Sequence, residues 1–287
     1  MESKGAHGFL AAMDGCDIPF RAWGEPTAAA LVLLHGGGPY SRWYEALGKA
    51  LAAREVGLLA YDQRGFGETA GPRGFATRFG SYLDDCGLAI AAAAARWPAA
   101  KVSLCGHSFG GLVALRYCLD RAGKGGLEPA TLVLMAPWIR DTLRAPTLTV
   151  ASALVNALFA PTVTYQVPLS VYDTADPSNR AVLSECQADR LWVHRLSARW
   201  FFGTRAAKLG ILRRVRGLRL PVLQLEGTND TLIDRDTNRR LFAAIGSPEK
   251  RLIVLRGVYH DMQLQSDIER IAEPVARFVR QGAAAVA

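Results

Sequence analysis

Runs of consecutive apolar residues recur along the first half of the chain and again near its end. The runs at residues 28–34, 57–62 and 131–136 lack polar alternation, which is typical of strands buried on both faces of a parallel sheet. The segments between or after these runs are predicted to be helices, at residues 43–54, 81–97 and 112–119. Strands and helices therefore alternate, and the pattern predicts an α/β fold with a mostly parallel, doubly wound sheet.

A short hairpin precedes this alternation, and a long segment interrupts it. Residues 8–23 contain two apolar stretches joined by Asp14-Gly15, a dipeptide that favours a tight hairpin turn. From about residue 139 to 219 no buried strand is expected, because prolines divide the segment into short pieces that favour helices. The helices predicted there cover residues 149–159, 179–188 and 191–202.

The alternation resumes after the interruption. The later strands are predicted at residues 221–227 and 251–255, and the later helices at 236–245 and 267–280. Because the same alternation stands on both sides, we interpret residues 1–139 and 206–287 as one core and residues 140–205 as a helical cap inserted into it. A length of 287 residues fits one large domain with such an insertion.

Composition limits the class of protein further. Hydrophobic residues make up 50% and charged residues 21% of the chain, as expected of a soluble globular protein. The five cysteines are scattered without a Cys-x-x-Cys pair, so reduced thiols are expected rather than disulfides or a metal site. The N-terminal apolar run is too short for a signal peptide and no run reaches membrane-spanning length, so the expected location is cytoplasmic.

A Gly-x-Ser-x-Gly pentapeptide stands where a further strand ends. Residues 101–105 form a largely apolar strand, Gly106-His107-Ser108-Phe109-Gly110 follows, and a helix-prone segment begins directly afterwards. This context is typical of a nucleophile elbow, in which a serine occupies a strained turn between a strand and a helix. Glycines two residues before and after the serine leave room for that turn. Ser108 is therefore the candidate nucleophile.

A serine nucleophile needs a base that takes its proton and an acid that orients the base. Ligands of such sheets bind at the carboxyl ends of the strands, so both partners are sought just after later strands. Of the five histidines, only His260 lies beyond a late strand, and Asp230 lies in the loop after residues 221–227. The other carboxylates considered for the acid are Glu226, Asp234 and Asp261. We prefer Asp230 and assign Asp234 to the start of the next helix, where a negative charge favours the dipole.

The tetrahedral intermediate of acyl transfer needs backbone N–H donors aimed at its oxyanion. One donor is expected from Phe109, which follows the nucleophile, and the other from Gly37, in the loop after residues 28–34. His35, at the start of that loop, is expected to brace it through hydrogen bonds. Three further residues are interpreted as packing or rim positions: His107, His194 and the core thiol Cys105.

Two features of the predicted cap and of the segment directly after it have open interpretations. Nine basic residues occur between residues 190 and 219 without an intervening Asp or Glu. They form either a solvated helix face or a surface that attracts an anionic substrate or membrane. The apolar residues Leu154, Val155, Leu158 and Phe159 form either the core of the cap or one wall of an acyl pocket. No nucleic-acid-binding motif is found, so nucleic acid is not an expected partner.

Further motifs complete a resemblance to a known family. They are His35-Gly36, Tyr61-Asp62-Gln63-Arg64-Gly65-Phe66-Gly67, Gly106-His107-Ser108-Phe109-Gly110-Gly111, the segment from Gly227 to Asp234, Tyr259-His260, and Leu196-Ser197-Ala198-Arg199-Trp200. With them, nearly the whole chain resembles the α/β-hydrolase superfamily, which has the chain order Ser, Asp, His. Within it, the chain most resembles the monoacylglycerol lipase and lysophospholipase group of serine aminopeptidase-like hydrolases. Two positions depart from that group's usual pattern: Phe109, where Met is usual, and Gly38 before Pro39.

The resemblance implies hydrolysis of carboxylic esters through an acyl-enzyme, without a metal or another cofactor. We therefore predict a serine hydrolase with the triad Ser108, Asp230 and His260 that acts on a small-molecule acyl substrate, acylglycerol- or lipid-like, beneath the cap. A proline-iminopeptidase-like aminopeptidase and a thioesterase or acyl transferase (cyclase) are the alternatives that use the same triad. A binding protein without catalysis is disfavoured because no triad member is missing, and a dehalogenase or epoxide hydrolase because those use Asp where Ser108 stands. Weak contact of the cap with an anionic membrane surface is a further expectation.

Overall fold

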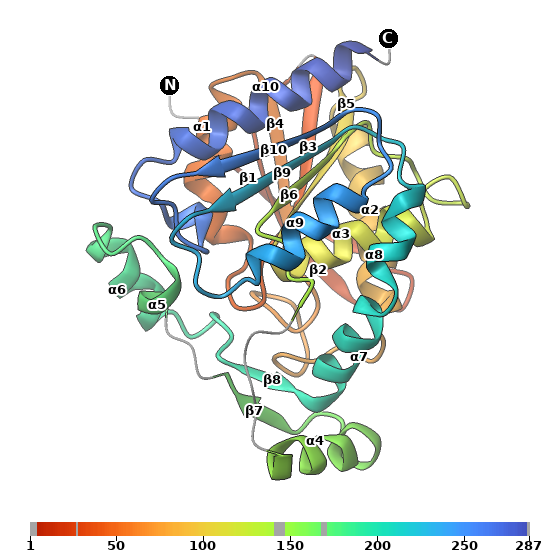
Figure 1. Cartoon of the computed structure of the whole chain (residues 1–287), viewed down its shortest axis with the longest axis vertical. Coiled ribbons are helices and arrows are strands. Elements are labelled where there is room, and N and C mark those ends of the chain that lie inside the picture. Colours follow the sequence, from red (N-terminus) through yellow and green to blue (C-terminus); the bar gives the residue numbers. More distant parts are fainter. Residues whose placement is uncertain (1–4, 27, 141–146, 168–170, 286–287) are drawn as a thin grey trace.

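An eight-stranded sheet forms the centre of the computed structural model, which describes residues 5–26, 28–140, 147–167 and 171–285 (Figure 1). Its strands are β1 (Ala6–Ala11), β2 (Asp17–Trp23), β3 (Ala29–Leu34), β4 (Val56–Tyr61), β5 (Lys101–His107), β6 (Leu132–Met135), β9 (Val222–Gly227) and β10 (Lys250–Leu255). Their spatial order is β1-β2-β4-β3-β5-β6-β9-β10. Pairing is antiparallel from β1 to β2 and from β2 to β4, and parallel between all other neighbours. The predicted hairpin and mostly parallel sheet are confirmed.

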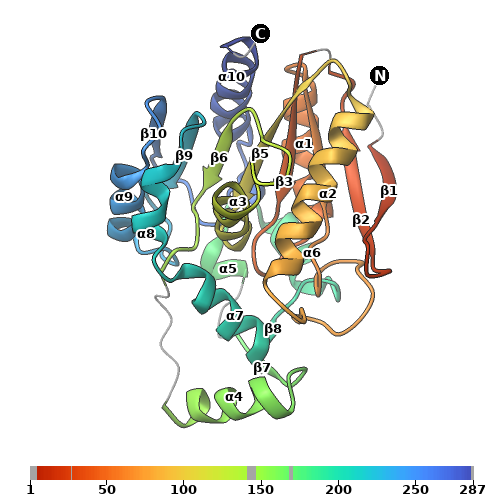
Figure 2. The ribbon, with the colours of Figure 1, turned by 90° about the vertical axis from the view of Figure 1, so that its right-hand side faces the viewer.

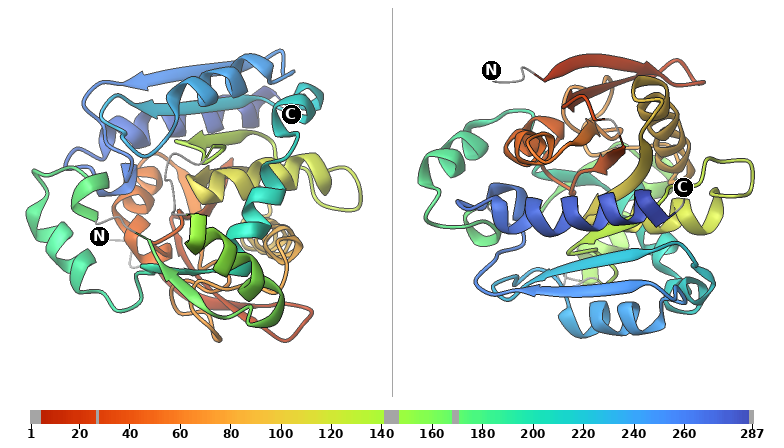
Figure 3. Two further views of the ribbon diagram at one scale, coloured as in Figure 1. Left: turned by 60° about the horizontal axis from the view of Figure 1, so that its bottom comes forward. Right: turned by 90° about the horizontal axis from the view of Figure 1, so that it is seen from above.

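Helices cover both faces of the sheet, as the alternation predicted (Figures 2 and 3). One face carries α1 (Glu45–Ala52), which follows the short turn η1 (Ser41–Tyr44), and α10 (Glu269–Ala285); the other carries α2 (Gly80–Arg96), α3 (Phe109–Asp120) and α9 (Arg235–Ala244). Successive residues of β3 pack alternately toward the two faces, so the strand is buried along its full length. Because fully burying one large apolar side chain contributes roughly 1.5–3 kcal/mol, an unbroken apolar run becomes the centre of the sheet.

The chain between β6 and β9 extends beyond the carboxyl ends of the parallel strands, and we call this part the cap (Figure 1). Its elements are α4 (Thr147–Phe159), β7 (Thr164–Gln166), α5 (Val171–Thr174), α6 (Arg180–Ala188), β8 (Arg195–Ser197) and α7 (Ala198–Lys208). The chain returns to the sheet through α8 (Ile211–Arg214) and the turn η2 (Val215–Gly217), and a further turn, η3 (Met262–Leu264), follows β10. The boundaries at residues 140 and 205 stay a prediction.

The helix predicted at residues 191–202 is wrong in its first half. Residues 195–197 form β8, which pairs antiparallel with β7, and α7 begins only at Ala198. The cause is a serine N-cap: Ser197 Oγ accepts a hydrogen bond from the backbone N–H of Trp200 at 3.1 Å. The spacing of apolar residues alone therefore places the start of this helix too early, whereas the N-cap Ser197 marks its true start.

The four apolar residues singled out in α4 are exposed, so the interpretation that they form the core of the cap is wrong. Their exposed fractions run from 54% to 83%, for Leu154, Val155, Leu158 and Phe159. The helix packs instead through small residues, since Ala153 and Ala157 lie against Ala198 at the start of α7. No described helix, α4 included, combines the length and apolar character that crossing a membrane requires.

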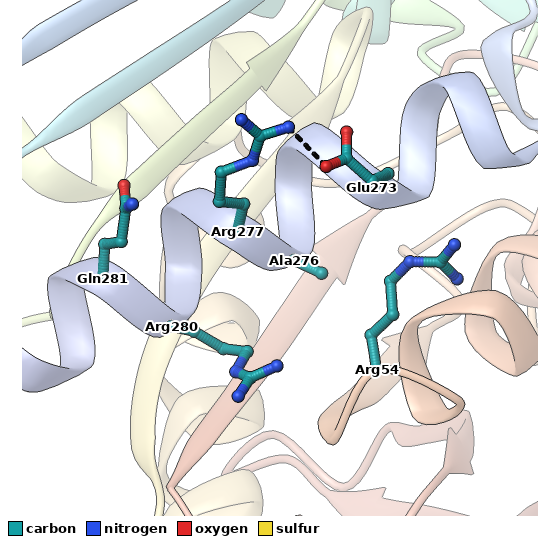
Figure 4. A pocket seen from close by; sticks show the side chains of 6 residues that line it. All are labelled: Arg54, Glu273, Ala276, Arg277, Arg280 and Gln281. Carbon is teal, nitrogen blue, oxygen red and sulfur yellow. Dashed lines mark hydrogen bonds and ion pairs between the residues drawn. The ribbon is translucent and has the colours of Figure 1, made fainter.

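A hollow of about 540 Å³ opens on the surface between α10 and the end of α1 (Figure 4). It is lined by Arg54, Glu273, Ala276, Arg277, Arg280 and Gln281. The arginines are already paired with glutamates, namely Arg54 with Glu269, Arg277 with Glu273 and Arg280 with Glu55. Because Arg54 precedes the amino end of β4, this hollow lies at the opposite edge of the sheet from the carboxyl ends of the strands.

Candidate active site

The turn between β5 and α3 places Ser108 at the carboxyl edge of the sheet. Its backbone has φ 51° and ψ −113°, a strained conformation that residues other than glycine rarely adopt. A Cβ atom on Gly106 would overlap the carbonyl oxygen of Gly110, and one on Gly110 would overlap the carbonyl oxygen of Leu34. Both glycines are therefore required by close backbone packing, and the predicted sharp turn from strand to helix is confirmed.

Side chains from three loops meet at this turn. His260 Nε2 lies 3.0 Å from Ser108 Oγ, and His260 Nδ1 lies 2.8 Å from Asp230 Oδ2. Asp230 follows β9 and His260 follows β10, so the parallel strands bring them to one edge of the sheet. The other carboxylate oxygen of Asp230 accepts the backbone N–H groups of Leu232 and Ile233. All three side chains are buried, and the structure brings together the three residues that the sequence selected.

The charges around His260 favour its protonated form. Burial lowers the pKa of His260, but the charge and hydrogen bond of the Asp230 carboxylate, together with the charge of Asp261, bring the net pKa above the ordinary value. Burial also raises the pKa of Asp230, yet the charge of His260 and hydrogen bonds bring the net pKa below its usual range. Asp230 is therefore ionised near neutral pH and accepts the Nδ1–H of His260, which leaves Nε2 to accept the Ser108 hydroxyl.

The other carboxylates considered for the orienting acid have different partners. Asp234 caps the first turn of α9 by accepting a backbone N–H at 2.9 Å, as the sequence predicted. Glu226 is a residue of β9, and its carboxylate accepts a hydrogen bond from the side chain of Gln224 at 3.0 Å. Asp261 faces the cap and accepts a hydrogen bond from the hydroxyl of Thr174. The carboxylate bonded to the His260 ring is that of Asp230.

Two backbone N–H groups beside Ser108 are available to a ligand. Among the described residues, no protein acceptor takes a hydrogen bond from the N–H of Gly37 or of Phe109. The Cβ of Phe109 lies 3.6 Å from the position that a Cβ on Gly37 would occupy, so the two expected donors are neighbours. Phe109 is also the first residue of α3, where the helix dipole favours a negative charge.

The loop after β3 is braced by His35, as expected. The Nδ1–H of His35 donates to the Gly36 carbonyl at 2.7 Å, and Nε2 accepts the backbone N–H of Gln63 at 2.9 Å. The Gln63 side-chain amide donates in return to the His35 carbonyl at 2.7 Å. Burial lowers the pKa of His35 to about 4, so the ring is neutral and can accept as well as donate.

A second buried histidine connects this loop to the loop of His260. The hydroxyl of Tyr44 donates to His107 Nδ1 at 2.7 Å, and its oxygen accepts the N–H of Gly36 at 3.2 Å. The Nε2–H of His107 donates to the His260 carbonyl at 2.9 Å, and burial lowers the pKa of His107 to about 3. From the sequence, His107 is interpreted as a packing or rim residue, and Tyr44 is given no role. The available signal was the place of His107 directly before Ser108.

Aromatic rings from the core and the cap pack together beside the turn. The buried ring of Phe109 contacts that of Trp200 with centroids 4.9 Å apart, and that of Tyr82 at 5.1 Å. Trp138, whose backbone N–H donates to the Ser108 carbonyl, stacks on Trp200 at 5.5 Å with nearly parallel planes. We call these four rings the aromatic wall. The sequence offered no periodic or motif signal for the contact between Trp138 and Trp200.

The described ranges contain no group of three His, Cys, Asp or Glu side chains placed to hold a metal ion. All five cysteines are free thiols, as predicted. Cys105 is buried in β5, and burial raises the pKa of its thiol far above the ordinary value.

The family model described as serine aminopeptidase, S33, matches residues 25–267. The chain belongs to this family. The matched range contains the whole cap as well as Ser108, Asp230 and His260. The resemblance to the α/β-hydrolases that the sequence motifs indicated is therefore confirmed, as is the α/β-hydrolase fold.

Named relatives are similar along most of the chain. Phospholipase YtpA of Bacillus subtilis is 26% identical over 259 residues, which cover 90% of this chain and 97% of the relative. The monoglyceride lipase of Homo sapiens is 28% identical over 254 residues, which cover 86% and 80%. The crystal structure of the Paleococcus ferrophilus monoacylglycerol lipase has a TM-score of 0.80 at 24% identity and covers 92% of this chain and 99% of that one, which shows a shared fold.

Proposed function

We propose that this protein is a serine hydrolase that cleaves carboxylic esters of acylglycerol- or lipid-like substrates through an acyl-enzyme. The observation that carries the proposal is the hydrogen-bonded series from Asp230 through His260 to Ser108. Next to it lie the N–H groups of Gly37 and Phe109, which donate to no acceptor in the described part of the chain. A nucleophile, a base, an orienting acid and oxyanion donors are what acyl transfer requires. The similarity to monoglyceride lipases and a phospholipase supports lipid esters as the substrate class.

In the first half-reaction, His260 Nε2 takes the hydroxyl proton of Ser108 while Oγ attacks the ester carbonyl carbon. The carbonyl oxygen gains the negative charge and accepts hydrogen bonds from the N–H groups of Gly37 and Phe109. Asp230 stabilises the imidazolium, which then gives its proton to the departing alcohol. In the second half-reaction, His260 takes a proton from water, the hydroxide attacks the acyl carbon, and Ser108 recovers its proton as the acid leaves.

The test compares the cleavage of p-nitrophenyl butyrate and decanoate by the wild-type protein and by Ser108→Ala. Removing the nucleophile costs roughly 10⁶ in kcat, so the variant should show no measurable turnover and no labelling by a fluorophosphonate probe. Ser184→Ala, which changes an exposed serine of α6, is the matched control and should behave as wild type. Ester cleavage that persists in Ser108→Ala would overturn the proposal.

Substrate panels separate ester hydrolysis from the other uses of the same residues. An aminopeptidase needs an acid to hold the free amine, but the cap carboxylate of Asp189 already accepts hydrogen bonds from Trp43 Nε1 at 3.0 Å and the N–H of Leu191 at 2.8 Å. Proline p-nitroanilide should therefore be a poor substrate.

Faster turnover of acyl thioesters than of oxygen esters would indicate a thioesterase. Mass spectrometry with competing alcohols would detect acyl transfer.

We also propose that the cap contacts an anionic membrane surface, where lipid esters are found. Its exposed face on α4 is apolar (Leu154, Val155, Leu158 and Phe159), and the chain carries a net charge of +8. Exposed arginines follow in α7 and beyond it, among them Arg205, Arg213 and Arg216. Each basic side chain near an anionic leaflet contributes roughly 1 kcal/mol of attraction.

A further inference from the structure

One segment of the cap lies directly on the loop that carries Gly37. We call residues 189–200 the strap. The backbone N–H of Val193 donates to the carbonyl of Gly38 at 3.0 Å. The ring of Trp192 lies against the same residue, because a Cβ on Gly38 would stand 2.8 Å from Trp192 Nε1. The atypical glycine before Pro39 therefore has a physical reason: the strap occupies the space of a side chain.

The other end of the strap covers Gly37. The Cη2 atom of Trp200 lies 3.7 Å from the position that a Cβ on Gly37 would occupy, and the Cβ of Phe109 lies 3.6 Å from it. Gly37 is thus packed between Trp200 and Phe109, whose rings also contact each other. Packing and the Val193 hydrogen bond hold the loop at two successive glycines.

The strap is itself fixed to the core at several points. Asp189 accepts a hydrogen bond from Trp43 Nε1 at 3.0 Å, and the rings of Trp43 and Trp192 contact each other edge to face at 5.8 Å. The N–H of Ser197 donates to the carbonyl of Gly74 at 2.9 Å. Because both ends are bonded to the core, the strap can restrict the loop that it covers.

We propose that the strap is a structural part of the oxyanion hole and that Trp200 is a positioning residue that holds the Gly37 N–H in line with Ser108. The inference rests on the proposed function, since it concerns one of the two oxyanion donors. Three successive glycines, Gly36 to Gly38, give the loop great backbone freedom. A donor stabilises the oxyanion only when its N–H already points at the developing charge. A loosened loop should therefore slow the chemical step without weakening ground-state binding.

The first experiment measures kcat and KM for p-nitrophenyl butyrate in Trp200→Ala, Trp200→Phe and Phe201→Ala. Loss of one oxyanion donor costs about 10²–10³ in rate, so Trp200→Ala should lower kcat by roughly 10- to 100-fold while KM changes less than about twofold. Trp200→Phe keeps a ring over Gly37 and should recover most of the loss. Phe201→Ala truncates the next ring of α7, which packs on Phe202, and should retain near wild-type kcat.

An alkyl trifluoromethyl ketone reports on the oxyanion hole itself, because Ser108 adds to it and the resulting oxyanion needs the same donors. Trp200→Ala should weaken binding of the ketone by the same factor as it lowers kcat/KM. It should leave unchanged the binding of the corresponding trifluoromethyl carbinol, which cannot form the adduct. Equal losses for ketone and carbinol would show that Trp200 only lines the pocket, and the inference would be overturned.

A second pair of variants tests the contact of the strap with Gly38. Gly38→Ala places a methyl group against Trp192 Nε1 and should lower kcat by roughly tenfold, because the strap is pushed off the loop. Adding Trp192→Phe removes the clashing atom, so the double variant should be several-fold more active than Gly38→Ala, and Trp192→Phe alone supplies the reference activity for this comparison. Failure of the double variant to recover would contradict the proposed role. If thermal unfolding shows that Trp200→Ala does not fold, this pair of variants tests the same proposal in its place.

Ser108→Ala makes the two proposals distinguishable. If it abolishes turnover while Trp200→Ala matches Phe201→Ala, the strap inference alone is overturned. If Ser108→Ala remains active, the proposed function is overturned and the strap inference with it.

Discussion

The sheet and the cap are held in place by different interactions. β3 and β4 are buried along their full length, whereas α4 exposes its large apolar side chains. The cap is attached by a smaller apolar contact, in which Leu183, Cys186 and Trp192 pack on Tyr40 and Trp43, and by particular hydrogen bonds to the loops that follow the strands. Asp261 bonds to Thr174 of α5, Ser266 bonds to Asp176 after it, and the strap bonds to the loop of Gly38. Burial distributes the stabilisation of the sheet over many side chains. The cap has fewer contacts with the core, so the loss of one hydrogen-bonding residue should affect its attachment more.

The candidate active site is likewise made of a part that belongs to the core and a part that belongs to the cap. The three groups that would carry out the chemistry follow β5, β9 and β10, whose positions the sheet fixes. The loops that carry them are covered by residues of the cap. Changes in the core half should therefore act on the chemistry directly, changes at the contacts between core and cap should tune it, and changes on the outer face of the cap should leave it intact.

After the loss of the nucleophile itself, the largest effect is expected from Asp230→Asn in the core part of the site. Asn cannot stabilise the imidazolium and presents a donor to His260 Nδ1, so the ring is held in the wrong tautomer. By analogy with serine-protease triads, kcat should fall by about 10⁴ while ester KM changes little. Loss of the carboxylate also lowers the pKa of His260, so the acid limb of the pH–rate profile should move to lower pH.

Asp234→Asn is the matched control for this change. Asn is as good an N-cap as Asp, so α9 should keep its cap and the protein its activity. A loss of less than about tenfold in Asp230→Asn would mean that another carboxylate orients His260 during turnover.

The core half of the site could be predicted because its signals are local. The glycines around Ser108 are required by backbone packing at that turn, and the apolar runs define the strands after which Asp230 and His260 follow. The strap could not be predicted, because the bond between Val193 and Gly38 joins distant residues through groups that every residue carries. The helix predicted at 191–202 failed for this reason in part, since β8 depends on its pairing with the distant β7, although the N-cap Ser197 was a local signal of the helix start. No local signal distinguishes the outer face of α4 from an inner one.

An intermediate effect is expected from Asp261→Asn, where the cap meets the loop of His260. Burial lowers the pKa of His260, and the carboxylates of Asp230 and then Asp261 raise it above the ordinary value. The ring of His107 lies 5.1 Å from that of His260 and stays neutral because burial lowers its pKa to about 3. Cys186 and Tyr44, which interact with Asp261, also stay neutral because burial raises the pKa of each. His260 acts as a base only when unprotonated, so kcat/KM rises with pH through its pKa. Removing the anion at residue 261 should move this rise to lower pH, and kcat at neutral pH should change less than about tenfold.

Thr174→Val separates the charge of Asp261 from its place in the structure. This variant loses the hydroxyl that bonds the carboxylate but keeps the carboxylate itself, so the pH–rate profile should stay at the wild-type position. A profile that moves equally in both variants would show that Asp261 acts by anchoring the cap rather than through its charge.

The smallest effect on the site is expected from replacing Leu158 and Phe159 of α4 together by serine. Both side chains are exposed, at 67% and 83%, so the free energy of unfolding should change by no more than about 0.5 kcal/mol per residue. Turnover of p-nitrophenyl butyrate in solution should be unchanged. Binding to anionic phosphatidylglycerol vesicles, measured by sedimentation, should weaken more than about tenfold. The reason is that burying each of these side chains in the membrane interface would contribute roughly 1.5–3 kcal/mol to binding.

Leu127→Ser is the control for this double variant, because Leu127 is a similarly exposed apolar residue that lies outside the cap. Its vesicle binding should equal that of wild type, and phosphatidylcholine vesicles should bind all three proteins weakly because the attraction to anionic lipid is missing. Equal binding of wild type and the α4 variant to anionic vesicles would exclude α4 as the membrane face. Slower turnover of the soluble ester in the α4 variant would instead show that the outer face of the cap is coupled to the site, and the division between a core that performs the chemistry and a cap that acts through a few contacts would then fail.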